Sequence, residues 1–203
     1  MGCQAKSSYA AGPHALLAFA GRASLAQAPA ASPNTKISVA SFRSLAQSCA
    51  TNVPVSTLEA IARTESALYP YALSINHPHQ LARRQGWNRG TITLERQPAS
   101  LEEAIAWTKW LFAHGITVSI GLLQVNSENA RALHLSVEQL FEPCTNLRAG
   151  DALLAATYTG VARAQGEGLR ALDTALSYYN TGKAEIGLHN GYVSQVKSNA
   201  LHH

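Results

Sequence analysis

Glu65 is the residue whose type and position are best suited to chemistry. It lies near the end of an apolar helical stretch, close to Ala62, Ala67 and Leu68, which predict an apolar wall around its carboxyl group. Burial raises the pKa of a carboxyl group toward neutrality, and such an acid can protonate the leaving oxygen of a glycosidic bond. The alternative is a solvated glutamate at a helix end with no chemical role.

Two further polar motifs follow Glu65-Ser66, namely GLLQ at 121–124 and Tyr178-Tyr179-Asn180. In this order and at these separations, the three pieces resemble the motifs of the soluble lytic transglycosylases, a lysozyme-like family that cleaves the glycan strands of peptidoglycan. Longer pieces resemble the branch that accompanies type IV secretion and conjugation machines. These pieces are GLLQVN at 121–126, Ser127-Glu128-Asn129, Phe141-Glu142-Pro143-Cys144, SYYNTG at 177–182 and Asn190-Gly191-Tyr192-Val193. The resemblance to the family covers roughly residues 42 to 197.

The resemblance implies cleavage of the β-1,4 bond between N-acetylmuramic acid (MurNAc) and N-acetylglucosamine (GlcNAc), with formation of 1,6-anhydro ends. Glu65 would act first as acid and then as base, while the substrate's own N-acetyl group stabilises the cation and its C6 hydroxyl attacks. The absence of Asp or Glu between positions 66 and 94 fits this one-carboxylate mechanism, although Glu95, Glu102 and Glu103 follow. A hydrolytic muramidase and a non-catalytic peptidoglycan-binding assembly module are the alternatives.

The resemblance also implies roles for the other motif residues. The hydroxyl group of Tyr179 is expected to hydrogen-bond the Glu65 carboxyl group. Ser66 is expected to fix the turn or orient Glu65, and Ser74 to contact the substrate N-acetyl group. Tyr178 stands where the family usually has Ala and is expected in the core. Further substrate contacts are expected from Gly121, Leu123, Gln124 and Asn180. Gly121 lets the backbone approach the substrate closely, and Gln124 offers an amide. Leu123 replaces the usual Met, and a structural role is the alternative for Asn180.

The cysteines are Cys3, Cys49 and Cys144. Cys3 lies in the N-terminal segment, which is expected to be outside the folded domain. This leaves Cys49 and Cys144 as a pair able to form one disulfide. Two buried thiols are the alternative, because free cysteine behaves as a small hydrophobe. Since the resemblance implies an enzyme outside the cytoplasm, where disulfides persist, we favour the bond.

The elements that must position these residues are predicted to be mainly helical. Apolar spacing and capping signals predict helices over 39–50, 55–67, 100–112, 127–133, 136–141, 146–164, 169–179 and 192–199. Residues 72–97 change to short β-like pieces, 73–75 and 91–94, which predict a small hairpin. The pattern itself indicates an α+β fold, and the resemblance narrows it to a single lysozyme-like domain over 36–199.

The ends of the chain are predicted to lie outside this domain. Residues 1–35 are rich in Ala, Ser, Gly and Pro and hold one short apolar run, 15–20, followed by small-residue sites typical of signal cleavage. Pro13, His14 and Arg22 make this signal a poor one. We nevertheless expect a flexible or export segment, a periplasmic protein, and a tail at 200–203.

The net charge of +4 suits an anionic partner such as peptidoglycan with its peptide carboxylates. The basic residues are scattered, so nucleic acid is not expected. His77-Pro78-His79 lacks a third ligand of suitable spacing, so neither a metal nor another cofactor is expected. Trp87 is the candidate for the cleft, while Trp107 and Trp110 are expected in the core. The expected partners are therefore peptidoglycan glycan strands and, through the resemblance, components of a secretion system.

Overall fold

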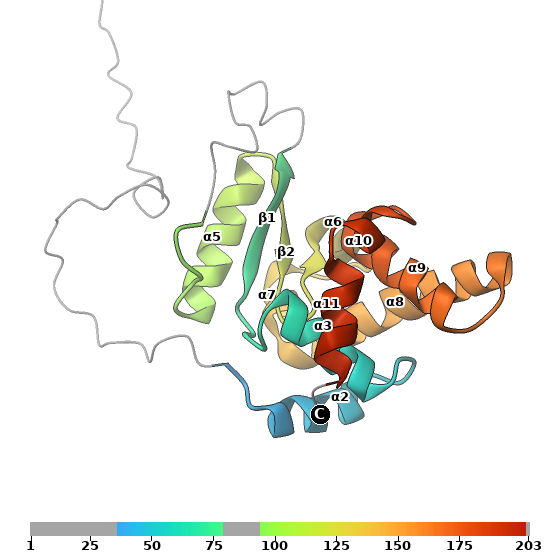
Figure 1. Ribbon diagram of the computed structural model, residues 1–203. Coiled ribbons are helices and arrows are strands. Elements are labelled where there is room, and N and C mark those ends of the chain that lie inside the picture. The colour runs from blue at the N-terminus through green and yellow to red at the C-terminus, as the bar shows by residue number, and fades with distance from the viewer. Residues whose placement is uncertain (1–35, 79–93, 202–203) are drawn as a thin grey trace, which may run out of the picture.

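The computed structural model describes residues 36–78 and 94–201. This part of the chain is mainly helical with one small antiparallel sheet, as predicted (Figure 1). The elements are α2 (Val39–Cys49), α3 (Val55–Glu65), β1 (Leu73–Pro78), α5 (Leu101–Ala113), β2 (Ile116–Ile120), β3 (Val125–Asn126), α6 (Ser127–Ala132), α7 (Val137–Phe141), α8 (Pro143–Gln165), α9 (Leu169–Thr181), α10 (Ile186–His189) and α11 (Tyr192–Leu201). Within the described ranges, no helix has both the length and the apolar character that a membrane crossing requires.

Local capping explains where several helices begin. The predicted capping box of α7 is present, because Ser136 and Gln139 each accept a hydrogen bond from the other's backbone N–H. Helix α8 begins three residues before the predicted position 146. The Glu142 carboxylate accepts hydrogen bonds from the backbone N–H groups of Cys144 and Thr145, which supplies the cap that the apolar spacing did not reveal. The four-residue helix α10 was not predicted.

The sheet has the order β1-β2-β3, with both pairs antiparallel. Leu73 pairs with Ile120 and Ile75 with Val118, so one face of the sheet is apolar, whereas the Ser74–Ser119 pair lies on the other face. Figure 1 shows α5 on one side of the two longer strands and the helices α3, α8, α9 and α11 on the other. The sheet therefore presents its serine-bearing positions where the chain can build a polar cleft.

The predicted partner of β1, residues 91–94, lies almost wholly outside the described ranges. Leu94 is outside any strand, and residues 91–93 lie outside the described ranges; the strand that pairs with β1 is β2, at 116–120. Strand β2 was missed because it is short and nearly all of it is buried, so it lacks the alternation that marks a half-buried strand. Gly115, with φ of 70°, ends α5 and lets the chain turn directly into β2.

The predicted disulfide between Cys49 and Cys144 is confirmed. It joins the last residue of α2 to the first turn of α8, with a Cα–Cα distance of 5.4 Å. A loop of 95 residues closed in this way stabilises a fold by about 4.7 kcal/mol in the chain-entropy account. The buried Asp151 carboxylate supports the same junction, because it accepts hydrogen bonds from backbone N–H groups at 51–53 between α2 and α3.

Helices α3 and α11 lie side by side, although they are far apart in the sequence (Figure 1). The middle of α3 is fully buried at 58–62. Within it, Glu59 forms salt bridges with Arg43 and Arg63 at 2.6 and 2.8 Å. The last turn of α3 is held to α11 by a hydrogen bond of 2.9 Å from Asn199 to Thr64. This packing brings the start of α11 next to the final residue of α3.

Candidate active site

A cleft with a volume of about 980 Å³ runs along the polar face of the sheet. The walls come from the end of α3, the three strands, α6, α8, α9 and α10. Most of the side chains that line it are polar and uncharged, which suits a ligand rich in hydroxyl and amide groups. They include Ser74, Asn76, Ser119, Gln124, Asn126, Asn129, Thr157, Asn180, Thr181 and Asn190, together with Glu65, Tyr178 and Tyr179.

Glu65 is the C-terminal residue of α3, and its side chain lines this cleft. The chain leaves the helix abruptly, because Ala67 and Leu68 both adopt the left-handed conformation, with φ of 51° and 65°. Such a conformation is unusual for residues other than glycine and persists only where the surroundings enforce it. Here the backbone N–H of Leu68 bonds back to the Ala62 carbonyl group at 3.3 Å. The sharp exit leaves the Glu65 carboxyl group at the edge of the cleft.

Among the described residues, the Glu65 carboxyl group has one side-chain hydrogen-bond partner, the hydroxyl group of Tyr192. That hydroxyl donates a hydrogen bond of 2.6 Å to Glu65 Oε1, and Tyr192 is the first residue of α11. Burial raises the pKa of Glu65 from its ordinary value of 4.5 to about 7, and the hydrogen bond from Tyr192 opposes part of this rise. The group can therefore both give and take a proton near neutral pH.

Glu65 is the only acidic residue that lines the cleft among the described residues. All 12 Asp and Glu residues of the chain lie within the described ranges, because residues 1–35, 79–93 and 202–203 contain none. Three of the other acids are engaged elsewhere: Glu59 with two arginines, Glu103 with Arg96, and Asp151 with backbone N–H groups. The cleft thus offers one carboxyl group for proton transfer.

The predicted hydrogen bond between Tyr179 and Glu65 was wrong. The Tyr179 hydroxyl group lines the cleft but donates to the backbone carbonyl of Leu123 at 2.8 Å. Tyr192 makes the predicted contact in its place. The signal that could have found it was present, since Tyr192 belongs to the Asn190-Gly191-Tyr192-Val193 piece of the resemblance, to which no chemical role was attached.

The turn at 121–124 joins β2 to β3 and is built around the buried side chain of Asn146. Asn146 donates to the carbonyl groups of Ile120 and Leu140 and accepts from the backbone N–H of Leu123, with all three distances between 2.8 and 2.9 Å. Gly121 has φ of 79°, and a Cβ atom there would lie 2.4 Å from Asn146 Nδ2. Glycine is therefore required by the turn and its support, and Gly121 does not line the cleft.

Gln124 is the last residue of this turn and has φ of 47°. Of the four turn residues, Gln124 is the one that lines the cleft. Its Nε2 group donates hydrogen bonds of 3.0 Å to the carbonyl groups of Ala72 and Gly121. Its Oε1 atom is buried and has no hydrogen-bond partner in the described part of the chain. Leu123 is 1% exposed and does not line the cleft, so the direct substrate contact expected for it is not supported by its position.

The remaining predicted residues also divide into those that line the cleft and those that support the turn. Ser74 is exposed and lines the cleft. The Ser66 hydroxyl group lies 2.9 Å from the Ala62 carbonyl oxygen and 2.8 Å from that of Leu122, so it ties the end of α3 to the turn rather than facing the ligand space. Asn180 lines the cleft and accepts a hydrogen bond of 3.0 Å from Asn190, whose own Oδ1 accepts from the backbone N–H of Tyr192.

The sequence matches the family described as Transglycosylase SLT domain over residues 43–201. The chain belongs to this family. Similar proteins include the protein virB1 of Agrobacterium fabrum, 34% identical over 165 residues, and the type IV secretion system protein virB1 of Brucella abortus, 33% identical over 165 residues. These alignments cover 81% and 78% of this chain but only 61% and 63% of the relatives, so the chain spans about three fifths of their length. No solved structure matches the chain.

Several cleft residues of this SLT domain were missed by the sequence analysis. Tyr178 was expected in the core, but its side chain is 41% exposed and lines the cleft together with Ile186, which is 51% exposed. Asn76 and Ser119 also line the cleft and hydrogen-bond each other at 3.1 Å across β1 and β2. Nothing in their spacing indicates this pairing, because it depends on the unpredicted strand β2.

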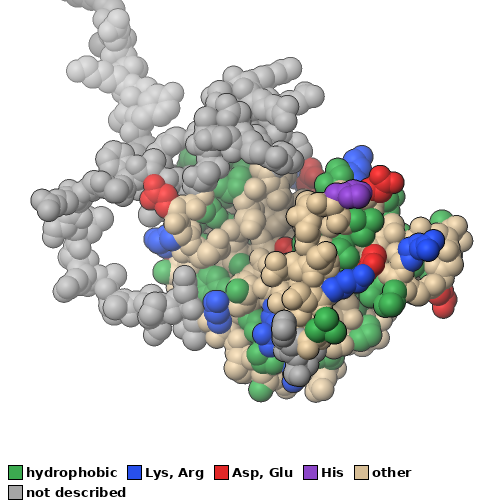
Figure 2. Space-filling view, viewed as in Figure 1, with side chains coloured by type: hydrophobic (Ala, Val, Ile, Leu, Met, Phe, Trp, Pro, Cys, Tyr) green, Lys and Arg blue, Asp and Glu red, His purple; other side chains and the backbone are tan. Residues whose placement is uncertain are grey.

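Two of the three tryptophans and one of the two histidines singled out in the sequence lie within the described ranges. Trp107 and Trp110 are buried in the core, as predicted. Trp87 and His79 lie outside the described ranges. Within the ranges that are described, no group of three His, Cys, Asp or Glu side chains could hold a metal ion. On the face shown in Figure 2, the Lys and Arg side chains are scattered and form no continuous basic patch.

Proposed function

We propose that this SLT domain is a lytic transglycosylase that cleaves the β-1,4 bond between MurNAc and GlcNAc in peptidoglycan and leaves 1,6-anhydro-MurNAc ends. The observation that carries the proposal is the single acidic residue of the cleft, Glu65, with a pKa of about 7 and a hydrogen bond from Tyr192. The family membership supports the same activity.

In the first step, Glu65 gives its proton to the glycosidic oxygen as the bond between that oxygen and C1 of MurNAc breaks. The N-acetyl group of the same sugar stabilises the positive charge that develops at C1. Because the pKa of Glu65 is raised to about 7, a large fraction of the carboxyl group is protonated at neutral pH and ready for this step.

In the second step, the Glu65 carboxylate takes the proton of the MurNAc C6 hydroxyl group as that oxygen forms a bond with C1. The proton given in the first step is thereby regained, and no water is consumed. The same carboxyl group serves as acid and base, so the reaction needs only the one acid that the cleft contains.

Tyr192 is the positioning residue for Glu65 in this proposal. Its hydroxyl group fixes one carboxyl oxygen, and it also limits the rise of the Glu65 pKa. Ser66, Gly121 and Leu123 act indirectly by building the junction between α3 and the 121–124 turn. Direct substrate contacts are assigned to residues that line the cleft, namely Ser74, Gln124 and Asn180.

Hydrolysis is the competing chemistry. Most hydrolytic glycosidases use a second carboxyl group as nucleophile or as the base for water, about 5 to 9.5 Å from the first. No second acid lines the cleft in the described part of the chain. A binding module would have no need of a buried carboxyl group whose pKa is raised, because burying an ionisable group costs free energy that a binding function does not recover.

Mass spectrometry of the products tests the proposal directly. The protein is incubated with purified peptidoglycan, and the masses of the soluble fragments are measured with and without borohydride reduction. We expect 1,6-anhydro ends, which resist reduction and weigh 18 Da less than reducing ends, the mass of one water. Reducing ends in their place would make the protein a muramidase, and no soluble product would reject both activities.

The setting of this activity is also a proposal. The relatives named above include a type IV secretion system protein, which supports a role in opening the cell wall locally for such an apparatus. This role places the domain in the periplasm and makes secretion-system components its partners. The confirmed disulfide supports an oxidising compartment. Protease accessibility in intact and in osmotically opened cells would test the location.

A further inference from the structure

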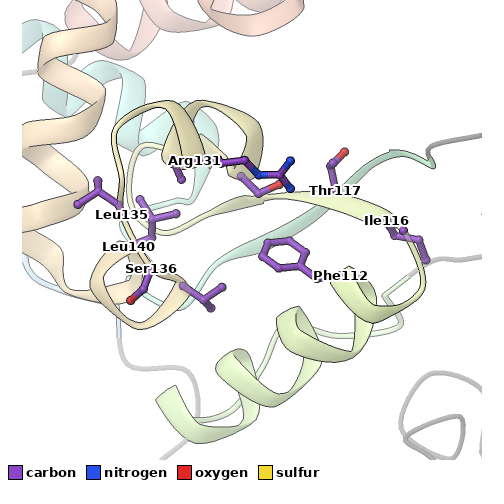
Figure 3. A pocket seen from close by; sticks show the side chains of 11 residues that line it. Phe112, Ile116, Thr117, Arg131, Leu135, Ser136 and Leu140 are labelled. Atoms are coloured by element: carbon purple, nitrogen blue, oxygen red, sulfur yellow. The ribbon is translucent and has the colours of Figure 1, made fainter. Parts of the chain in front are cut away.

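A second pocket, with a volume of about 340 Å³, lies beside the cleft and is not used by the proposed chemistry. Its walls come from α5, β2, α6 and α7 (Figure 3). Apolar side chains form most of the lining, and Figure 3 shows the ring of Phe112 and the guanidinium group of Arg131 on opposite sides of the same space. This combination suits a ligand that carries small apolar groups next to an anion.

Helix α6 separates this pocket from the cleft. Asn126 and Asn129, three residues apart, line the cleft, whereas Ala130 and Arg131 line the pocket. Residues three apart share one face of a helix, so the two cavities lie on different faces of the same short helix. Strand β2 links them as well, because Thr117 lines the pocket and Ser119, two residues further along, lines the cleft.

Among the described residues, Arg131 is the one charged side chain that lines the pocket. Arg131 is exposed, and among the described salt bridges none involves it. Glu128, one turn earlier on α6, does not line the pocket. The wall opposite Arg131 is apolar: Phe112 is 39% exposed there, and buried Leu140 contributes to the floor. An exposed aromatic ring beside an exposed guanidinium group is typical of a binding surface.

We propose that this pocket binds the stem peptide of peptidoglycan, the short peptide attached to MurNAc, while the glycan strand occupies the cleft. The inference rests on the proposed function, because it takes the substrate of the cleft to be peptidoglycan. Stem peptides combine alanine methyl groups with free carboxylates, which match the apolar wall and Arg131. The pocket would then distinguish peptide-bearing strands from stripped ones.

The width of α6, which separates the two cavities, allows one substrate to reach both. An α-helix with its side chains is about 10 Å across, and an extended peptide advances about 3.3 Å per residue. Three to four residues of a stem peptide therefore span α6. Because the peptide and the glycan are covalently linked, the second contact is intramolecular and strengthens binding without changing the chemistry at Glu65.

A binding experiment that does not depend on cleavage tests the inference first. The soluble tetrapeptide L-Ala-γ-D-Glu-diaminopimelate-D-Ala is titrated into the isotope-labelled full chain, and backbone amide shifts are followed by NMR. We expect shifts around Phe112, Arg131 and Leu135 that are lost in Arg131→Gln and in Phe112→Ala. Arg163→Gln, which removes an exposed charge from the end of α8, should retain them. Shifts confined to Ser74 and Ser119, or no shifts, would overturn the inference.

Kinetics then separate this inference from the proposed function. Solubilised strands with intact stem peptides are compared with strands stripped by an amidase. For Arg131→Gln we expect KM to rise about 3- to 10-fold on peptide-bearing strands, the range for a partly exposed charged hydrogen bond, with kcat unchanged. On stripped strands the variant should match the wild type. Equal effects on both substrates, or no effect on either, would reject the stem-peptide site and leave the pocket to a protein partner. Absence of cleavage by the wild type would reject only the proposed function.

Discussion

The end of α3 and the turn at 121–124 are joined directly through Ser66, yet their polar groups are used differently. Both contain non-glycine residues with positive φ, Leu68 at 65° and Gln124 at 47°. At the end of α3, the Glu65 carboxyl group opens to the cleft, and its pKa is raised to about 7. The turn is supported by the buried amide of Asn146, on α8, which makes three hydrogen bonds with backbone groups.

The difference shows what a polar motif in this family can mean. A group that transfers protons must keep part of its bonding capacity for the substrate and must have a pKa near the working pH. A group that holds a turn is most useful when every donor and acceptor is satisfied internally. Tyr192 and Tyr179 divide in the same way, since one donates to the Glu65 carboxyl group and the other to the Leu123 carbonyl group.

The largest expected effect is that of Glu65→Gln. The amide cannot give or take the proton in either step, and proton transfer contributes about 10²–10⁴-fold to a rate, so we expect a loss of at least about 10³-fold in kcat. The fold should survive, because the amide oxygen can still accept the hydrogen bond from Tyr192. Product release from peptidoglycan measures the effect, and Glu167→Gln, at an exposed loop position, controls for the lost charge. Substantial activity in a folded Glu65→Gln protein would contradict the mechanism.

The sequence predicts the polar end of α3 well because its signals are local. The apolar spacing that ends at Glu65, the break at Pro54 and the capping box at Ser136 each involve neighbours within a turn or two. The disulfide prediction succeeded for a different reason. Only one pair of cysteines remained once Cys3 was set aside, and the resemblance implied a compartment in which disulfides persist.

The partner of Glu65 could not be predicted because it depends on packing across 127 positions. Tyr179 and Tyr192 are both tyrosines in the C-terminal helices, and no local pattern says which one approaches α3. The choice is made by α11, which packs along α3 and places its first residue at the carboxyl group. The missed strand β2 has the same origin, since burial on both faces removed the alternation that would have revealed it.

The stability of the protein should depend on the ionisation of Glu65 in a defined direction. Its folded pKa of about 7 exceeds the ordinary 4.5, so the folded state binds this proton more tightly. The resulting stability is fully present below about pH 4.5 and is lost as pH rises through about 7. The shift corresponds to roughly 3 to 4 kcal/mol in the free energy of unfolding.

Urea unfolding of the wild type and Glu65→Gln across this pH window isolates the Glu65 contribution, because the other titrating groups are common to both proteins. We expect the wild type to lose stability relative to the variant between pH 4.5 and pH 8. Parallel stability curves would mean that the carboxyl group is solvated, and the proposed acid would then lack its raised pKa.

Tyr192→Phe should have the next largest effect, and it should act on activity more than on stability. Loss of the 2.6 Å hydrogen bond frees the carboxyl group to move, and misplacement of a catalytic group by about 1 Å can cost on the order of 10²-fold in rate. The same bond holds the pKa of Glu65 down, so its loss should raise that pKa further and move the alkaline limb of the kcat/KM profile to higher pH. An unmoved limb would show that Tyr192 does not control the carboxyl group.

Tyr179→Phe should have the smallest effect, and it provides the sharpest contrast with Tyr192→Phe. The substitution keeps the ring but removes the donor to the Leu123 carbonyl group, so we expect a loss of about 0.5–1.5 kcal/mol in the free energy of unfolding. Gly150 lies against the same contact, with the Tyr179 hydroxyl oxygen 3.0 Å from where its Cβ would be, so little rearrangement is open to the turn. Activity per folded molecule and the position of the alkaline limb should therefore stay close to the wild-type values. If Tyr179→Phe instead loses activity and shifts the limb as much as Tyr192→Phe does, both hydroxyl groups act on Glu65, and the division between the proton-transfer site and its supporting turn would not hold.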